Sequence, residues 1–338
     1  MAVRKEGAAL PLGPLGGTKY MKKRILSILC AAVMLLTACS QPAQSGSGSA
    51  SGSEEETITI LATTYPVYLF ANTVVQGVEG VVVDRLDTGA ISCLHDYTLS
   101  VGDMKKIEGA DVIAINGVGL ETFMEDALAS SQATVIDTSE GVELLESLAH
   151  HHEEGDAHDH GHYDPHIWMS PKNAITMIQN ISESLAKLTP KNAPAYLKNT
   201  TAAMHQLETC DKELEELVGY SRLDMSGGLV TFHDGFQYFA KAFHIPLLAA
   251  IEEEAGSEAS AKEINEITAM VKDQSIPMIY AETNGSDATA QAISRETGCA
   301  VGQLNMLMSG EGQDVTAYIE SLKADVQAVV DGLTGNVG

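Results

Sequence analysis

The feature that most constrains this fold is an alternation of short β-type runs with helical patterns, which occurs twice along the chain. In the first set, strand-like runs cover 57–62, 81–86, 111–116 and 133–138, with helical patterns at 66–77, 98–109 and 120–129. In the second, strand-like runs cover 228–232, 246–250, 277–281 and 300–304, with helical patterns at 235–243, 258–273, 286–297 and 312–332. Strands that alternate with helices form βαβ units around a parallel sheet. The sequence therefore predicts two α/β lobes.

A purely helical stretch separates the two sets. Ser170 and Pro171 form a helix start, and apolar residues then recur at spacings of three and four until Pro190. Pro194 begins a second helical pattern that runs to Val218. We therefore expect an N-terminal lobe at 57–190, a linking helix at 191–220 and a C-terminal lobe at 221–338.

The N-terminal segment indicates secretion and lipid anchoring. "MKKR" from Met21 precedes a short apolar run, which is too short to span a membrane comfortably and is typical of a signal peptide. Leu36-Thr37-Ala38-Cys39 matches the lipobox of bacterial lipoproteins. We expect 1–38 to be the signal peptide, with the true start at Met21. Cys39 would carry the lipid, and 39–56 would be a flexible tether at the extracytoplasmic face of the bacterial cell membrane.

The charge of the chain bears on its partners. The formal net charge is −26, which repels nucleic acid and anionic lipid and attracts cations. The same acidity would also keep a secreted protein soluble. Past the lipobox, only Cys93, Cys210 and Cys299 remain. They have no C-x-x-C spacing, which argues against a thiolate metal site but allows one disulfide.

Three histidines follow strands and precede helices, where ligands of α/β proteins bind. They are His95, His166 and His233. Acidic residues lie beside each of them and could orient the imidazole of a ligating histidine. Three imidazoles with a fourth oxygen donor make a tetrahedral zinc site. With an open fourth position, the same set would suit a zinc hydrolase, although the chain lacks an H-E-x-x-H motif.

A histidine cluster precedes His166. Six histidines alternate with acidic residues and show no apolar periodicity, so we expect a mobile loop at 150–162. We interpret it as an auxiliary segment that gathers zinc. The alternative interpretation is an insertion that the fold tolerates and that has no role. The six are His150, His151, His152, His158, His160 and His162.

Several segments resemble the substrate-binding lipoproteins of zinc and manganese ABC importers. They are "HDYTLSVGDMKKIEGADVIAINGVGLE", "DPHIWMSPKNAITMIQNISESLAKLTP", "TFHDGFQYFAKAFHIP" and "IPMIYAETNGSDATAQAISRETGCAVGQLN". The resemblance covers about 57–335. It implies two (β/α)4 lobes with parallel four-stranded sheets, joined by a long rigid helix. It also implies a metal between the lobes, bound by His95, His166 and His233.

The resemblance further implies a function. The chain would bind Zn²⁺ as its transported ligand and deliver it to an ABC permease, as a monomer and not as an enzyme. Where manganese members carry a carboxylate, this chain has His233, and nitrogen donors favour zinc. Many relatives close the site with Asp, whereas this chain has Asn305, so the fourth ligand would be Asn305 or Glu282. A manganese importer component, an adhesin of the same fold and a zinc hydrolase remain the alternatives.

Overall fold

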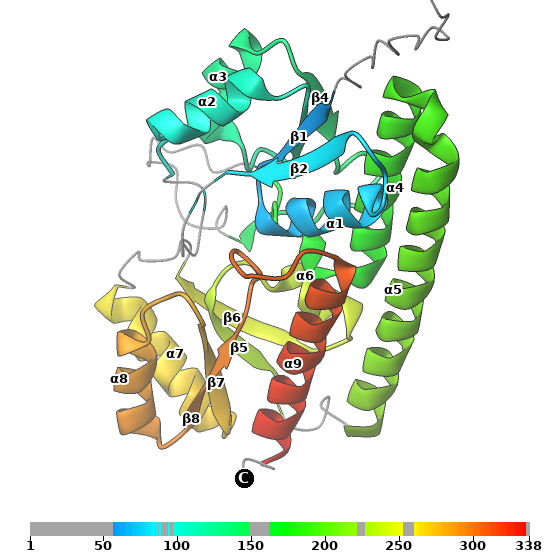
Figure 1. The fold of residues 1–338 in the computed structure, drawn as a ribbon. Helices are drawn as coiled ribbons and strands as arrows, with labels where there is room; N and C mark the ends of the chain where they lie inside the picture. Colours follow the sequence, from blue (N-terminus) through cyan, green and yellow to red (C-terminus); the bar gives the residue numbers. More distant parts are fainter. Residues whose placement is uncertain are drawn as a thin grey trace, which may run out of the picture. The chain divides into compact units, whose positions relative to one another are not determined.

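The computed structural model describes residues 57–86, 88, 94, 97–148, 162–221, 227–252 and 260–335. The first lobe has a parallel sheet of four strands in the order β2-β1-β3-β4 (Figure 1). Its strands are β1 (Ile58–Ala62), β2 (Val81–Arg85), β3 (Val112–Ile115) and β4 (Thr134–Asp137). Its helices are α1 (Tyr65–Val75), α2 (Val101–Gly109), the 3-10 turn η1 (Thr122–Met124) and α3 (Glu125–Ser130).

Both faces of the central strands β1 and β3 are covered, which fits their mostly apolar sequences. Successive side chains of a strand point to opposite faces. Ile60 therefore packs in the cluster that contains α1, whereas Leu61 and Ile113 pack against apolar residues of α2 and α3.

The second lobe repeats this arrangement with the strand order β6-β5-β7-β8, also parallel. Its strands are β5 (Leu229–His233), β6 (Leu247–Glu252), β7 (Met278–Glu282) and β8 (Ala300–Leu304). Its helices are α6 (Gln237–Ala242), α7 (Ala261–Asp273), α8 (Ala288–Thr297) and α9 (Val315–Thr334). Phe232 and Ile279 face α7 and α8, whereas Tyr280 faces α9 and donates hydrogen bonds to its carbonyls.

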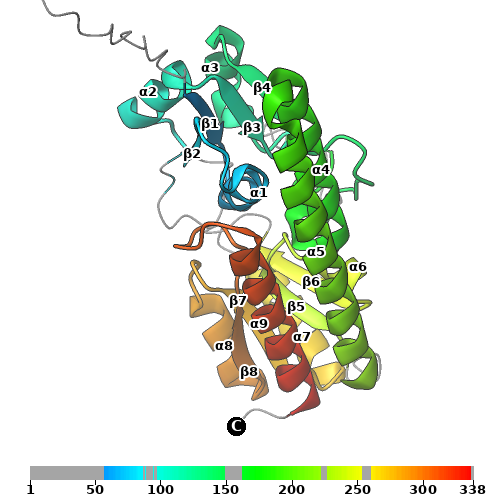
Figure 2. The ribbon, with the colours of Figure 1, turned by 45° about the vertical axis from the view of Figure 1, so that its right-hand side comes forward.

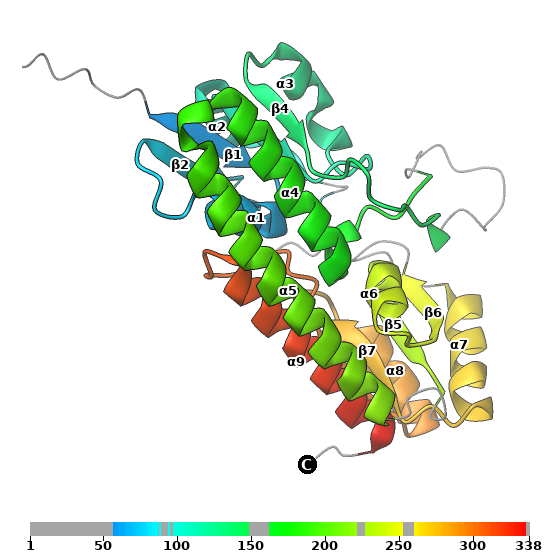
Figure 3. The same cartoon turned by 90° about the vertical axis from the view of Figure 1, so that its right-hand side faces the viewer.

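Along the chain, α4 (Pro171–Leu188) and the 3-10 turn η4 (Pro190–Asn192) follow the strands of the first sheet and lead into α5 (Ala193–Ser221). With 29 residues, α5 is about 44 Å long at 1.5 Å per residue. It packs beside α1 and α4 of the first lobe and beside α9 of the second (Figures 2 and 3). Its buried residues, among them Tyr196, Leu207 and Leu214, join one apolar cluster that contains residues of both lobes.

The predicted fold class of two parallel α/β lobes joined by a long helix is confirmed. Two local expectations change. The helix predicted at 120–129 is a 3-10 turn followed by the short α3, and β6 extends to Glu252, two residues beyond the strand expected at 246–250. Ser170 is the N-cap of α4, but its side chain makes no capping hydrogen bond.

Other expectations fall partly outside the described residues. The signal segment, Cys39 and the tether lie there, and so does Cys93. Cys210 and Cys299 are buried free thiols. Within the described ranges, no helix combines the length and the apolar character that crossing a membrane requires.

Candidate metal centre

His166 lies at the centre of a tight turn that leads into α4. Its backbone has φ −78° and ψ 43°, and the N–H of Ile167 donates to the carbonyl of Pro165 at 2.8 Å. These values are close to those of an inverse γ-turn. The 3-10 turn η3 (Ile167–Met169) follows directly. Hydrogen bonds of the backbone therefore fix the chain on both sides of His166.

Asp164 orients the imidazole of His166. Its Oδ1 lies 2.7 Å from Nδ1 of the ring and also accepts the His166 backbone N–H at 2.9 Å. Asp164 and His166 are 1% and 4% exposed, so this contact is screened little by water. A proton on Nδ1 leaves the lone pair on Nε2, which is the tautomer that a metal requires of an imidazole ligand.

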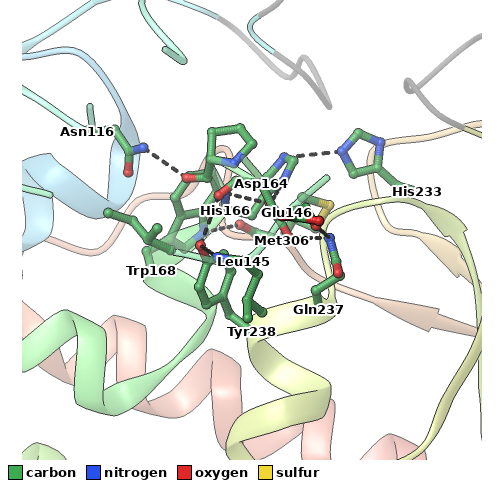
Figure 4. Close-up of polar contacts among 12 residues, drawn as sticks. Asn116, Leu145, Glu146, Asp164, His166, Trp168, His233, Gln237, Tyr238 and Met306 are labelled. Carbon is green, nitrogen blue, oxygen red and sulfur yellow. Dashed lines mark hydrogen bonds and ion pairs between the residues drawn. The ribbon is translucent and has the colours of Figure 1, made fainter. Parts of the chain in front are cut away.

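His233 ends β5 and meets His166 across the two lobes. It is 2% exposed, and its Nε2 lies 3.3 Å from Nε2 of His166 (Figure 4). Two Zn–N bonds of 2.0–2.1 Å at a tetrahedral angle place their nitrogens about 3.3–3.4 Å apart. The spacing of this pair therefore fits two ligands of one zinc ion.

Residues of α6 secure Asp164 from the second lobe (Figure 4). Gln237 Nε2 donates to Asp164 Oδ2 at 3.1 Å, and the Tyr238 hydroxyl donates to the Asp164 carbonyl at 3.1 Å. The same Tyr238 oxygen accepts the N–H of Leu145 at 2.9 Å. Burial raises the pKa of Tyr238 to about 12, so the hydroxyl keeps its proton. The carboxylate beside His166 is thus held by both lobes.

Trp168 forms a second link between the lobes, next to His166. Its ring packs edge-on against the imidazole, with the centroids 5.3 Å apart, and its Nε1 donates to the Met306 carbonyl at 2.9 Å. The Tyr318 hydroxyl of α9 donates to the Trp168 carbonyl at 2.6 Å. Trp168 and Tyr318 were not predicted from the sequence as parts of the site. The aromatic-rich runs that contain them are a visible signal, but their partners are distant in sequence.

The two candidates for a fourth ligand differ in their hydrogen bonding. Asn305 Oδ1 already accepts the N–H of Leu307 at 2.8 Å. Glu282 ends β7, is 4% exposed, and has no hydrogen-bond partner for either carboxylate oxygen among the described residues. Burial raises its pKa to about 8. Because Thr231 pairs with Tyr280, Glu282 ends its strand level with His233 on the neighbouring strand.

Most of the remaining predicted site residues lie outside the part of the chain that the structure describes. His95 and five of the loop histidines lie outside the described residues: His150, His151, His152, His158 and His160. His162 is exposed, with Nε2 3.9 Å from Glu146 Oε1. In the part of the chain that is described, no three His, Cys, Asp or Glu residues form a group that could hold a metal. The described centre is thus a histidine pair with its supporting carboxylate.

Comparisons with known proteins agree with this architecture. A model of the family "Zinc-uptake complex component A periplasmic" matches residues 60–332. The zinc-binding lipoprotein AdcA of Streptococcus pneumoniae is 30% identical over 319 residues, which are 91% of this chain and 60% of that protein. The high-affinity zinc uptake system protein ZnuA of Bacillus subtilis is 28% identical over 318 residues, which are 91% of this chain and 97% of that protein. The chain thus spans about 60% of the AdcA relative.

Solved structures show the same fold. A crystal structure of ZnuA superposes with a TM-score of 0.70 at 25% identity, covering 82% of this chain and 99% of that chain. The laminin-binding protein Lmb of Streptococcus agalactiae, described as a bifunctional protein with adhesin and metal-transporting activity, superposes with a TM-score of 0.69 at 27% identity and the same coverage. With the family match over 60–332, these findings show that the chain belongs to the zinc-uptake complex component A family.

Proposed function

We propose that this protein binds Zn²⁺ outside the cytoplasm and delivers it to an ABC permease for import. The observation that carries the proposal is the 3.3 Å spacing of two buried imidazole Nε2 atoms, one from each lobe. The names of the relatives, a zinc-binding lipoprotein and a zinc uptake protein, support the same cargo. Two nitrogen donors also favour zinc over manganese, which prefers carboxylate oxygens.

In this proposal, His95 is the third ligand of the ion that His166 and His233 bind. Glu282 is a better fourth ligand than Asn305, because its two oxygens are buried and find no hydrogen-bond partner in the described part of the chain, whereas Asn305 Oδ1 is already engaged. A cation would favour the ionised form of Glu282, which burial alone disfavours. The carboxylate would also reduce the net charge that zinc brings into the site.

The membrane arrangement is part of the same proposal. A lipid on Cys39 and the tether at 39–56 would hold the protein at the extracytoplasmic face of the cell membrane, next to the permease. The histidines of 150–162 would bind further zinc ions, weakly, near the entrance to the site. The protein would act as a monomer and make or break no bonds.

A zinc hydrolase is a weaker explanation of the same site. The carboxylate that contacts His166, Asp164, is 1% exposed and has both oxygens engaged by His166 and Gln237. A general base must instead reach a water molecule or the substrate. An adhesin role is suggested only by the description of the Lmb relative. Binding of purified protein to laminin, with and without zinc, would test it.

Competition titration of Zn²⁺ against a chromophoric chelator tests the proposed function. The full chain should bind one zinc ion tightly. Replacing His166 or His233 by Ala should weaken this site at least 100-fold, because each removes a ligand from a buried centre. His205→Ala is the matched control, since His205 is exposed on α5. Equal tight binding by all four proteins would contradict the proposal.

A further inference from the structure

The carbonyl of Pro165 closes the turn that aims His166. It accepts the N–H of Ile167 at 2.8 Å and a second hydrogen bond from Asn116 Nδ2 at 2.9 Å (Figure 4). The first bond is local to the turn, whereas the second comes from the end of β3, 49 residues earlier in the chain. The direction of the His166 side chain therefore depends on where Asn116 holds this carbonyl.

Asn116 is itself buried and held. It is 0% exposed, and its Nδ2 also donates to the carbonyl of Gly117 at 3.1 Å. Its Oδ1 has no hydrogen-bond partner among the described residues. A buried amide oxygen without a partner is unfavourable. The stabilising contact of this side chain is thus made by its amide nitrogen, which links the end of β3 to the turn centred on His166.

Glu121 fixes the backbone that carries Asn116. Its Oε1 accepts the Asn116 N–H at 2.7 Å and the Thr63 hydroxyl at 2.6 Å, and its Oε2 accepts the Gly117 N–H at 3.1 Å. Glu121 is 4% exposed. Thr138 Oγ1 donates to the Asn116 carbonyl at 3.1 Å. Glu121 and Asn116 together thereby link the carboxyl ends of β1, β3 and β4.

We propose that Asn116 is a positioning residue for metal binding, and that Glu121 acts through it. Neither residue contacts the metal in this account. Asn116 fixes the Pro165 carbonyl, this carbonyl fixes the turn, and the turn holds the imidazole of His166 at the spacing from His233 that zinc requires. The inference rests on the proposed function and extends it to residues about 50 positions before the ligand.

The first test compares Asn116→Ala with Asn199→Ala in the full chain. The two are matched, because Asn199 Nδ2 also donates to two backbone carbonyls, those of Val74 and Gln76, at 3.0 and 2.9 Å. Zn²⁺ affinity is measured by chelator competition, and the visible spectrum of bound Co²⁺ reports the geometry around the ion. Asn116→Ala should weaken zinc binding about tenfold, in the range known for indirect partners of metal ligands, and should change the Co²⁺ spectrum. Asn199→Ala should change neither.

Glu121→Gln supplies a second, milder variant, which carries the test if Asn116→Ala does not fold. It keeps an acceptor for Thr63 and Asn116 but loses the bond from Gly117, so we expect about threefold weaker zinc binding. Combined with Asn116→Ala, its effect should be less than additive, because both act through the same carbonyl.

The outcomes separate the two proposals. If the wild type binds zinc tightly and Asn116→Ala matches Asn199→Ala in affinity and Co²⁺ spectrum, the positioning role is overturned. If Asn116→Ala does not fold, Glu121→Gln decides: an unchanged zinc affinity and an unchanged Co²⁺ spectrum of this variant also overturn the positioning role. If the wild type itself binds no zinc tightly, the proposed function fails first.

Discussion

Replacing Glu282 by Gln should stabilise the metal-free protein at alkaline pH and weaken its binding of zinc. Glu282 is 4% exposed, and its carboxylate oxygens have no hydrogen-bond partner among the described residues. Ionising it therefore removes a charge from water without compensation. Gln has nearly the same shape and cannot ionise, so the substitution isolates the contribution of this charge.

The magnitude follows from the pKa. The carboxyl has an ordinary value of 4.5, and burial raises its pKa in the folded protein to about 8. The folded protein thus binds this proton more tightly than the unfolded chain does. The stability that the protonated Glu282 contributes to the folded protein is fully present below pH 4.5 and is lost as the pH rises to about 8. At 1.36 kcal/mol per pH unit, the loss is at most about 5 kcal/mol, and relaxation of the site reduces it.

The assay is denaturant unfolding of chelator-treated wild type and Glu282→Gln from pH 4 to 9. The stability of the variant relative to the wild type should rise by about 2–5 kcal/mol across this range. Burial also raises the pKa values of Glu121 and Asp325 to about 7, but both residues are present in each protein and cancel in the difference. A difference that does not change with pH would refute the reasoning.

Three further predictions concern the site directly, and a fourth concerns a control position on α5. Asp164→Asn should weaken zinc binding 10–100-fold, measured by chelator competition, because the charged acceptor beside His166 Nδ1 becomes a neutral amide with only one acceptor oxygen, which cannot serve both His166 and Gln237. Gly235→Ala should weaken binding in the same assay, since the new Cβ would lie 2.2 Å from Met306 Cε and 2.8 Å from His233 Cδ2. Gly219→Ala, at an exposed helical position where an added Cβ would have no described atom within 4 Å, should instead leave binding unchanged and raise stability by about 0.5–1 kcal/mol. Affinity should fall as the pH is lowered, because imidazoles bind metal only when neutral and protons compete with the ion, and a pH-independent titration would contradict this.

Much of the fold could be predicted from local pattern. The strands are short apolar runs that end near polar residues, and every strand expected from the sequence is present within a residue or two. The stop at Pro190 separates α4 from α5 as expected. These features follow from backbone geometry and side-chain periodicity, which act over a few residues.

The supporting structure of the site could not be predicted in this way. His166 and His233 were identified because each lies shortly before a helix, and His233 also ends a strand. Asn116, Gln237 and Tyr238 support the site through hydrogen bonds to residues 49–93 positions away. No periodicity or spacing rule links such residues, because only the folded chain brings them together. Asn116 in particular was predicted only as the last residue of the strand-like run 111–116, with no role at the site.

X-ray absorption at the zinc edge tests the central claim most directly. The full chain, loaded with one equivalent of zinc, should show nitrogen ligands at about 2.0–2.1 Å with the scattering pattern of imidazole. The imidazole contribution should decrease by one ligand in His166→Ala and by one in His233→Ala. An unchanged ligand shell in both variants would show that zinc binds elsewhere, and the pair at 3.3 Å would then not be the metal centre.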